Sequence, residues 1–335
     1  MDSRSSGSTR PLVFGHRGAC GYRPENTLEA FELAFVQGVD AIEFDVVPTG
    51  DGQLIVSHDP WLSHNTDVVD HPEFADRERE ITLYGRWKVI DWFSVDFTVA
   101  EIKTLFARER MTEQRPGSAK FDDQFKIPTL DELLAAPFVS GKTLILEVKH
   151  GNHFATLGSQ FDPVPMVKAA LERSDWQARG MKFIFESFDF AVLSALKKAL
   201  GGVGEYVFLT EKVRLPEGET QVSAEMLQRV AAEFDGISVE WALLFDPVDE
   251  AASSAQFGEP SGLVADAHAL GLKVFGWTAR AEEAKFSIEE YYHNLVSSGV
   301  DGIFADQPDL LLAVLAETDP MPTPVSVASP RIAKL

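Results

Sequence analysis

The sequence has a single cysteine, Cys20, among its 335 residues. An internal disulfide and a zinc site built on several thiolates are therefore excluded, and we expect Cys20 to be a small filler residue in a loop. No apolar stretch approaches the roughly 18 uninterrupted residues that a transmembrane helix needs. The first ten residues, MDSRSSGSTR, lack the apolar core of a secretory signal. We therefore expect a cytoplasmic protein without a membrane span.

Positive charge is also scarce, because 30 Lys and Arg residues face 52 Asp and Glu residues, for a formal net charge of −22. A chain of this charge without a basic stretch repels nucleic acid and anionic bilayers. We therefore expect no nucleic-acid partner and no stable membrane association. The hydrophobic content of 45% is sufficient for a large core, so global disorder is excluded as well.

Eight short apolar runs alternate with segments whose apolar residues recur at three- and four-residue spacing, which is typical of helices. The runs are residues 12–15, 41–46, 143–148, 182–186, 206–209, 236–239, 273–276 and 302–305. Eight such units predict a closed (β/α)8 TIM barrel of the α/β class. A doubly wound open sheet is the alternative, but it would gather its polar groups at one switch point. Here polar residues follow nearly every run.

Within the first sixty residues, ionisable side chains occur at the ends of three apolar runs. His16 and Arg17 follow the first run, Glu43 and Asp45 end the second, and His58 follows a further run at residues 54–56. Two residues apart on a strand means the same face. Barrel enzymes carry their chemistry at the C-terminal rim of the strands. We therefore expect these side chains to converge.

Residues 59–127 break the alternation of strands and helices. The segment is charged, rich in aromatic residues, and too long for an ordinary connection. We interpret it as an inserted subdomain that caps the barrel mouth, with a surface excursion without function as the alternative. The barrel domain would then span residues 11–316, between Pro- and Ser-rich flexible tails at residues 1–10 and 317–335.

A set of short motifs now points to a known family. H-R-G, P-E-N-T, E-x-D, D-G and H-D follow one another between residues 16 and 59. In this order and spacing they resemble the opening of the glycerophosphodiester phosphodiesterase family. Matches downstream are Glu147-Val148-Lys149, Ser187-Phe188, Trp277-Thr278 and Asp306-Gln307-Pro308, so the resemblance covers roughly residues 12–315. It implies hydrolysis of small glycerophosphodiesters, such as glycerophosphocholine, to sn-glycerol 3-phosphate and an alcohol.

Three carboxylates, those of Glu43, Asp45 and Glu147, would meet at the barrel rim. Like charges this close disfavour one another unless a positive charge intervenes. A divalent cation with oxygen ligands is one solution, and Mg²⁺ and Ca²⁺ fit equally. The alternative is a structural network in which Arg17 and Lys149 neutralise the carboxylates.

His16 and His58 are the expected general acid and base, because imidazole titrates near neutrality. In the family that this chain resembles, these histidines assist attack on phosphorus and departure of the alcohol. Which of them acts first as the acid is open. The adjacent Asp59 either orients His58 or caps the next turn.

The remaining site residues follow from the same resemblance. We expect Arg17 and Lys149 to meet phosphate oxygens, Trp277 to lie against the glycerol carbons, and Ser187 to line the pocket. Whether Glu25 or Asn26 of P-E-N-T touches the site is open. For the other histidines we expect solvent-facing or structural roles: His64, His71, His150, His153, His268 and His293. If the chain is still extended at His150, its side chain should point away from that of Lys149.

Two other functions are possible for a chain with these motifs. The first is a lysophospholipase D or sphingomyelinase D-like phosphodiesterase that acts on lipids, and the second is a non-catalytic phosphate-binding barrel. Arg280 stands where many family members carry asparagine after the Trp-Thr pair, which bears on head-group recognition. The oligomeric state is left open.

Overall fold

The computed structural model describes residues 10–83, 87–212, 214–215, 218–219, 222–248 and 256–318. Within these ranges, eight parallel strands close into a barrel in the order β1-β2-β6-β7-β8-β11-β12-β13, and β13 pairs with β1. The strands are β1 (Leu12–Gly15), β2 (Ala41–Pro48), β6 (Thr143–Val148), β7 (Lys182–Ser187), β8 (Glu205–Thr210), β11 (Gly236–Glu240), β12 (Lys273–Ala279) and β13 (Gly302–Ala305). The predicted (β/α)8 barrel is confirmed.

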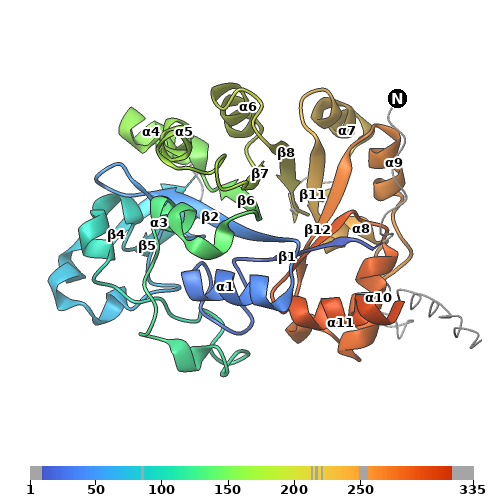
Figure 1. Cartoon of the computed structure of the whole chain (residues 1–335), viewed down its shortest axis with the longest axis horizontal. Helices are drawn as coiled ribbons and strands as arrows, with labels where there is room; N and C mark the ends of the chain where they lie inside the picture. The colour runs from blue at the N-terminus through green and yellow to red at the C-terminus, as the bar shows by residue number, and fades with distance from the viewer. Residues whose placement is uncertain are drawn as a thin grey trace, which may run out of the picture.

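Helices surround the barrel on its outside (Figure 1). They are α1 (Leu28–Gln37), α3 (Leu130–Ala135), α4 (Gly151–Leu157), α5 (Pro163–Arg173), α6 (Phe190–Ala199), α7 (Ala224–Ala231), α8 (Trp241–Leu244), α9 (Leu263–Ala269), α10 (Ile288–Ser297) and α11 (Pro308–Thr318). Helix α1 begins where the Thr27 side chain accepts a hydrogen bond from the Ala30 amide, as threonine commonly does at this position. Within the described ranges, every helix is too short or too polar to reach across a bilayer.

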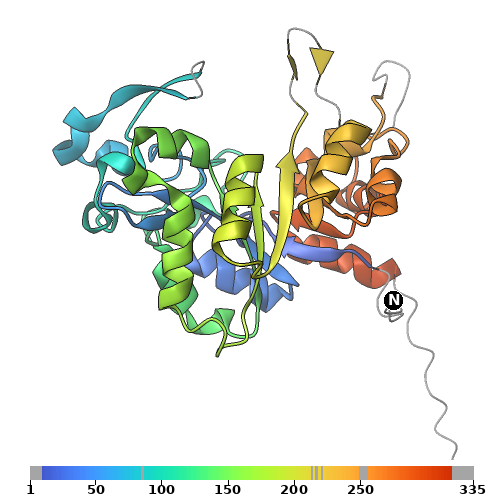
Figure 2. The same cartoon turned by 90° about the horizontal axis from the view of Figure 1, so that it is seen from above.

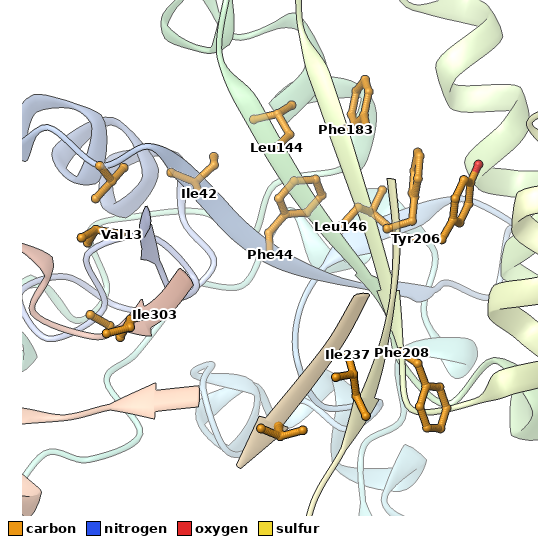
Figure 3. Packing of buried hydrophobic residues seen from close by; sticks show 14 of the residues in the cluster. Val13, Ile42, Phe44, Leu144, Leu146, Phe183, Tyr206, Phe208, Ile237 and Ile303 are labelled. Carbon is orange, nitrogen blue, oxygen red and sulfur yellow. The ribbon is translucent and has the colours of Figure 1, made fainter. Parts of the chain in front are cut away.

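Side chains alternate between two cores along each strand, because successive residues point to opposite faces. The outward residues pack under the helices, and Figure 3 shows Ile42 and Phe44 of β2 beside Leu144 and Leu146 of β6. The inward residues form a smaller apolar layer inside the barrel. Its members are Phe14, Ala41, Ile145, Ile184, Val207, Phe275 and Phe304. This alternation fixes which later residues of each strand point into the barrel.

The inserted segment begins after β3 (Leu54–Val56), which pairs antiparallel with the end of β2. It holds a hairpin of β4 (Arg79–Leu83) and β5 (Trp87–Asp91) and the short helix α2 (Val99–Ile102). Its own apolar cluster includes Phe74, Phe93 and Phe97. In Figure 2 the hairpin, in cyan, projects from the rest of the inserted segment.

Short elements complete the chain. The 3₁₀ turns are η1 (Val68–Asp70), η2 (Pro72–Arg77), η3 (Ser94–Asp96), η4 (Ala119–Phe121), η5 (Pro137–Val139), η6 (Ser159–Phe161) and η7 (Ala281–Glu283), and β9 (Arg214–Leu215) pairs with β10 (Gly218–Glu219). The predicted tails comprise residues 1–10 and 317–335. Arg10 is paired with Asp40 at 2.9 Å, and α11 continues to Thr318. Residues 1–9 and 319–335 of those tails lie outside the described residues.

Candidate active site

Acidic side chains occupy the rim of the barrel directly above the inward apolar layer. Glu43 and Asp45 follow Ala41 on the inner face of β2, and Glu147 follows Ile145 on β6. The register pairs Asp45 with Glu147 across these two strands. All three side chains are buried, and one ligand oxygen from each lies within 4.8 Å of the others. The structure thus brings together the three carboxylates that the sequence singled out.

The H-R-G motif forms a tight turn that places Arg17 against this cluster. Arg17 has a φ of 52°, and Gly18 follows with a φ of 83°. A Cβ at Gly18 would lie 2.5 Å from the backbone carbon of Ala30 in α1, so only glycine allows this close approach. The turn directs the Arg17 amide to Glu43 Oε2, at 2.9 Å.

The P-E-N-T motif contacts the site through both residues that the sequence left open. Asn26 adopts a φ of 58°, a conformation that asparagine tolerates, and its side-chain amide donates to Asp45 Oδ2 at 2.9 Å. Glu25 Oε2 accepts from the Arg17 guanidinium, also at 2.9 Å. Each therefore holds one of the charged groups of the rim in place.

Two cations neutralise part of the acidic cluster. Lys149 Nζ lies 2.6 Å from Glu147 Oε2 and 3.4 Å from Asp45 Oδ1, and Arg17 Nε lies 3.4 Å from Asp45 Oδ2. Burial opposes ionisation of Asp45, but Lys149 and Arg17 outweigh it and hold the pKa of this carboxyl below its ordinary value. Burial and the charge of Asp45 raise the pKa of Glu43 well above its ordinary value. Burial also raises the pKa of Glu147, to about 7.

The two cations do not provide a hydrogen bond to every carboxylate oxygen of the cluster. Asp45 Oδ1 and Glu147 Oε1 are buried without a hydrogen-bond partner, a situation that normally costs free energy. Both are carboxylate oxygens, the donors that Mg²⁺ and Ca²⁺ prefer. The residues present therefore fit a divalent cation. The ion pairs of Arg17 and Lys149 with these carboxylates, which the sequence offered as the alternative, are present as well.

His16 is held by an aspartate from the opposite end of the chain. Its Nδ1 lies 2.6 Å from Asp306 Oδ1. Because an ionised carboxylate only accepts hydrogen bonds, Nδ1 carries the hydrogen, and Nε2 is the atom that can exchange a proton with a ligand. Burial and the charge of Arg17 lower the pKa of His16 to about 4, although Asp306 acts in the opposite direction.

His58 has a matching arrangement. Its Nδ1 lies 2.7 Å from Asp59 Oδ1, and Asp59 Oδ2 lies 2.9 Å from His64 Nδ1. Burial, followed by the charges of Arg17 and Lys149, lowers the pKa of His58 well below its ordinary value. The contact between ring and carboxylate favours the orienting role for Asp59 over a cap.

A cavity of about 520 Å³ opens over this rim. All of the predicted site residues line it except Asp45, which lies behind the others. Trp277 stands edge to face with Phe188 at 5.6 Å between ring centroids, so the two rings form an apolar wall. The Ser187 hydroxyl donates to the Val148 carbonyl at 3.0 Å and accepts from the Asp189 amide at 3.1 Å. It therefore holds the turn after β7.

His150 also lines this cavity. It has a φ of 50° and directly precedes α4, so the chain is not extended there and the condition for its side chain to point away from Lys149 is not met. Glu186 is a further residue of the cavity lining. It is paired in register with Glu147, and burial followed by the charge of Glu147 raises its pKa well above the ordinary value.

Arg280, which the sequence associated with head-group recognition, is bound within the protein. Its Nε donates to Asp306 Oδ2 at 3.0 Å, and its NH1 donates to Glu283 Oε1 at 2.9 Å. Asp306 itself lay in a recognised motif, but its partner His16 is separated from it by 290 residues. Only the closure of the barrel, which pairs β13 with β1, brings them together.

The fold and this rim define a barrel enzyme with an acidic cluster and two imidazoles held by carboxylates. Comparison with known proteins gives its family. The model of the glycerophosphoryl diester phosphodiesterase family matches residues 16–310, so the chain belongs to this family and is a phosphoric diester hydrolase.

Individual relatives agree with this assignment. A glycerophosphodiester phosphodiesterase of Arabidopsis thaliana is 30% identical over 89% of this chain and 84% of its own length. One of Haemophilus influenzae is 25% identical over 89% and 88%. Among solved structures, a phosphodiesterase of Oleispira antarctica, in complex with its product sn-glycerol-3-phosphate, has a TM-score of 0.63 at 23% identity, over 92% of this chain and 97% of that one. A glycerophosphodiester phosphodiesterase of Thermotoga maritima has a TM-score of 0.55 at 24% identity, over 92% and 100%.

Proposed function

We propose that the enzyme hydrolyses small glycerophosphodiesters to sn-glycerol 3-phosphate and an alcohol, with a divalent cation at Glu43, Asp45 and Glu147 and with His16 and His58 as general acid and base. One observation carries this proposal: each imidazole is bound at Nδ1 by a carboxylate, beside a cluster of three acidic ligands. The product bound to the Oleispira relative supports the same reaction.

Mg²⁺ and Ca²⁺ both suit the all-oxygen donor set. A cation held there would supply positive charge to the phosphate oxygens as negative charge develops on them. The protein adds to this charge through Arg17 and Lys149, which line the cavity next to the carboxylates. Their place at the rim lets both bind non-bridging phosphate oxygens, in keeping with charge-assisted hydrogen bonding.

The glycerol moiety is assigned to the apolar wall of the cavity. Trp277 and Phe188 present ring surface there, and Lys149 Nζ lies 5.3 Å from the centre of the Phe188 ring. The carbon chain would lie against these rings with its phosphate directed towards Lys149. Ser187 shapes this wall through its two backbone hydrogen bonds.

The two imidazoles carry the protons. One neutral ring accepts a proton from the attacking water as the water oxygen bonds to phosphorus, and the other, protonated, donates a proton to the departing alcohol oxygen as its P–O bond breaks. Burial and neighbouring cations keep the unliganded rings neutral. An anionic phosphodiester in the cavity offsets those cations and so favours the protonated form of one ring.

The inserted segment at residues 59–127 contributes the cap over this cavity. Trp87, at the start of β5, lines the cavity together with the barrel residues. An aromatic side chain at the entrance limits the size of the alcohol that can be accommodated. This position favours small head groups over acylated lipids.

The decisive test is a panel of glycerophosphodiesters assayed for sn-glycerol 3-phosphate with a coupled dehydrogenase, with Mg²⁺, Ca²⁺ and Mn²⁺ in turn. We expect turnover that a chelator abolishes and one of these cations restores. Lysophosphatidylcholine, tested in parallel, should be a poor substrate. Faster turnover of that lipid would favour the lipid-directed alternative, and no release from any diester would contradict the proposal.

A further inference from the structure

Two arginines of the inserted segment, Arg110 and Arg115, pair with the aspartates that hold the histidines. The Arg115 guanidinium pairs with Asp306 Oδ2 and with Glu282 Oε1, the latter at 2.8 Å, and its side chain is only 3% exposed. Arg110 pairs with Asp59 Oδ2, and its Nε lies 3.4 Å from Glu25 Oε2. One loop of the insertion thus contacts both halves of the acid–base pair.

In both aspartates, one carboxylate oxygen contacts the histidine and the other contacts the arginine. In Asp306, Oδ1 faces the His16 ring and Oδ2 faces Arg115. In Asp59, Oδ1 faces the His58 ring and Oδ2 faces Arg110. An arginine that fixes one oxygen of a carboxylate also fixes the direction of the other, because the group is planar.

This arrangement matters for proton transfer. A carboxylate that is free to rotate would let the imidazole turn and would no longer select the tautomer with hydrogen on Nδ1. Asp59 and Asp306 are each at most 5% exposed, so water does not replace a lost guanidinium easily. Arg280 also binds Asp306, and His64 also binds Asp59. Each aspartate therefore keeps one other partner when its arginine is removed.

The loop that carries the arginines is held firmly within the insertion. The Glu109 amide donates to Asp122 Oδ1 and the Met111 amide donates to Glu109 Oε1, at 2.7 and 2.8 Å. The Arg115 amide donates to the Met111 carbonyl at 2.8 Å. These bonds fix the backbone from which both guanidinium groups project.

We propose that Arg110 and Arg115 are positioning residues, through which the inserted segment holds His58 and His16 in the orientation for proton transfer. The proposal rests on the proposed function for the catalytic role of the two rings. It gives the insertion a task in the reaction that is separate from covering the cavity. The competing explanation is that the two arginines only attach the insertion to the barrel.

The test compares Arg110→Met and Arg115→Met with Arg108→Met. Arg108 is a matched control because it lies in the same loop but pairs with Asp70 and Asp123, both inside the insertion. We expect each of the first two variants to lose about 10–100-fold in kcat, the range for outer partners of a site, with KM changed by less than about threefold. The control should keep kcat within about twofold.

A second measurement does not depend on turnover. Two-bond ¹H–¹⁵N spectra of the imidazoles report which ring nitrogen carries the hydrogen. We expect Arg115→Met to alter the His16 pattern and Arg110→Met to alter the His58 pattern, each without effect on the other ring. Unchanged kcat and unchanged patterns in folded variants would show that the arginines are only attachments, and would overturn the proposal.

The test can also end in unfolded methionine variants or in a wild-type enzyme without activity on glycerophosphodiesters. If the methionine variants fail to fold, Arg110→Lys and Arg115→Lys keep the charge but lose the planar fork. We expect a smaller loss of kcat with the same ring-specific spectral change, and wild-type behaviour in both measurements would overturn the proposal. If the wild-type enzyme hydrolyses no glycerophosphodiester, the proposed function fails, while the spectra still decide whether the arginines orient the rings.

Discussion

The inside of the barrel consists of two layers that arise from the same strands. In the lower layer, the Phe14 ring lies 5.0 Å from the rings of both Phe275 and Phe304. Two residues further along β1 and β13 come His16 and Asp306, which belong to the charged upper layer. Both layers are buried, but the lower one is apolar and the upper one concentrates ionisable groups.

The two layers contribute to the free energy of folding with opposite signs. Burial of aromatic rings in the lower layer stabilises the barrel, at about 25 cal/mol per Å² of apolar surface. Burial of unpaired carboxylate oxygens in the upper layer opposes folding. The stable layer therefore serves as a rigid base for a layer whose arrangement suits a ligand rather than stability.

The largest effect on activity is expected when a histidine of the upper layer is replaced. We expect His16→Ala and His58→Ala each to lower kcat/KM by about 10²–10⁴-fold, because each removes one proton-transfer group. The free energy of unfolding should change by no more than about 1 kcal/mol. The coupled assay for sn-glycerol 3-phosphate and urea titration measure the two quantities. Near-normal turnover of both variants would remove the acid–base proposal.

The opposite result is expected in the lower layer. Phe14→Ala should reduce the free energy of unfolding by about 3–5 kcal/mol, because a buried aromatic ring leaves a cavity. The folded enzyme should keep its chemistry, since the ring contacts no proposed ligand. Val36→Ala, at a side chain that is 78% exposed, is the control and should change stability by less than about 0.5 kcal/mol. Equal denaturation midpoints for the two variants would contradict the assignment of the stabilising layer.

A smaller effect should follow removal of one charge from the acidic cluster. Glu43→Gln keeps an acceptor for the Arg17 amide but removes an ionisable carboxyl group. In the presence of a chelator we expect this variant to be more stable than the wild-type protein by roughly 1–3 kcal/mol, because burial and the charge of Asp45 oppose ionisation of Glu43 in the folded state and the variant has no group to ionise. It should also lose activity and stabilisation by the cation. Glu32→Gln, on the exposed side of α1, should alter none of these properties measurably.

The last predicted effect is a slope in the pH dependence of stability. The folded pKa of Glu147 is raised to about 7, whereas an unfolded glutamate titrates at about 4.3. Between these values the folded state holds a proton that the unfolded state has lost, so this contribution to stability is present at low pH and disappears as the pH rises to about 7. One such group changes the free energy of unfolding by about 1 kcal/mol per pH unit.

The lowered pKa of His16 acts with the opposite sign over part of this range, because its unfolded form binds the extra proton. The difference between wild-type and Glu147→Gln protein, both with chelator, removes that contribution. We expect the stability advantage of the variant to grow from pH 5 to pH 7 and then to level off. A constant difference across this range would show that Glu147 titrates normally in the fold.

The sequence was sufficient for the barrel and for much of the rim. Apolar runs locate the strands, and the alternation of faces then places Glu43, Asp45 and Glu147 on the inside, because these relations are local in the chain. The partners of the histidines are of a different kind. Asp306 meets His16 across 290 residues, and Arg115 meets Asp306 across 191. Contacts over such separations depend on the closed fold and leave no periodic pattern.

His150 shows a second limit of prediction from the sequence. Its side chain was expected to point away from Lys149 if the chain is still extended at this position. The chain instead turns at His150 through a left-handed conformation, which histidine adopts only occasionally. The residue type alone does not signal such a turn.

The closure of the barrel between β1 and β2 has a practical consequence. Only Phe14 with Ala41 and Gly15 with Ile42 are paired there. The His16 amide then donates to the Ala305 carbonyl of β13, and the Arg17 amide donates to a side-chain oxygen of Glu43. An ion bound by this oxygen would weaken its bond to the Arg17 amide. The exchange of the Arg17 amide hydrogen with solvent deuterium should therefore report whether a cation is bound, and it requires no substrate.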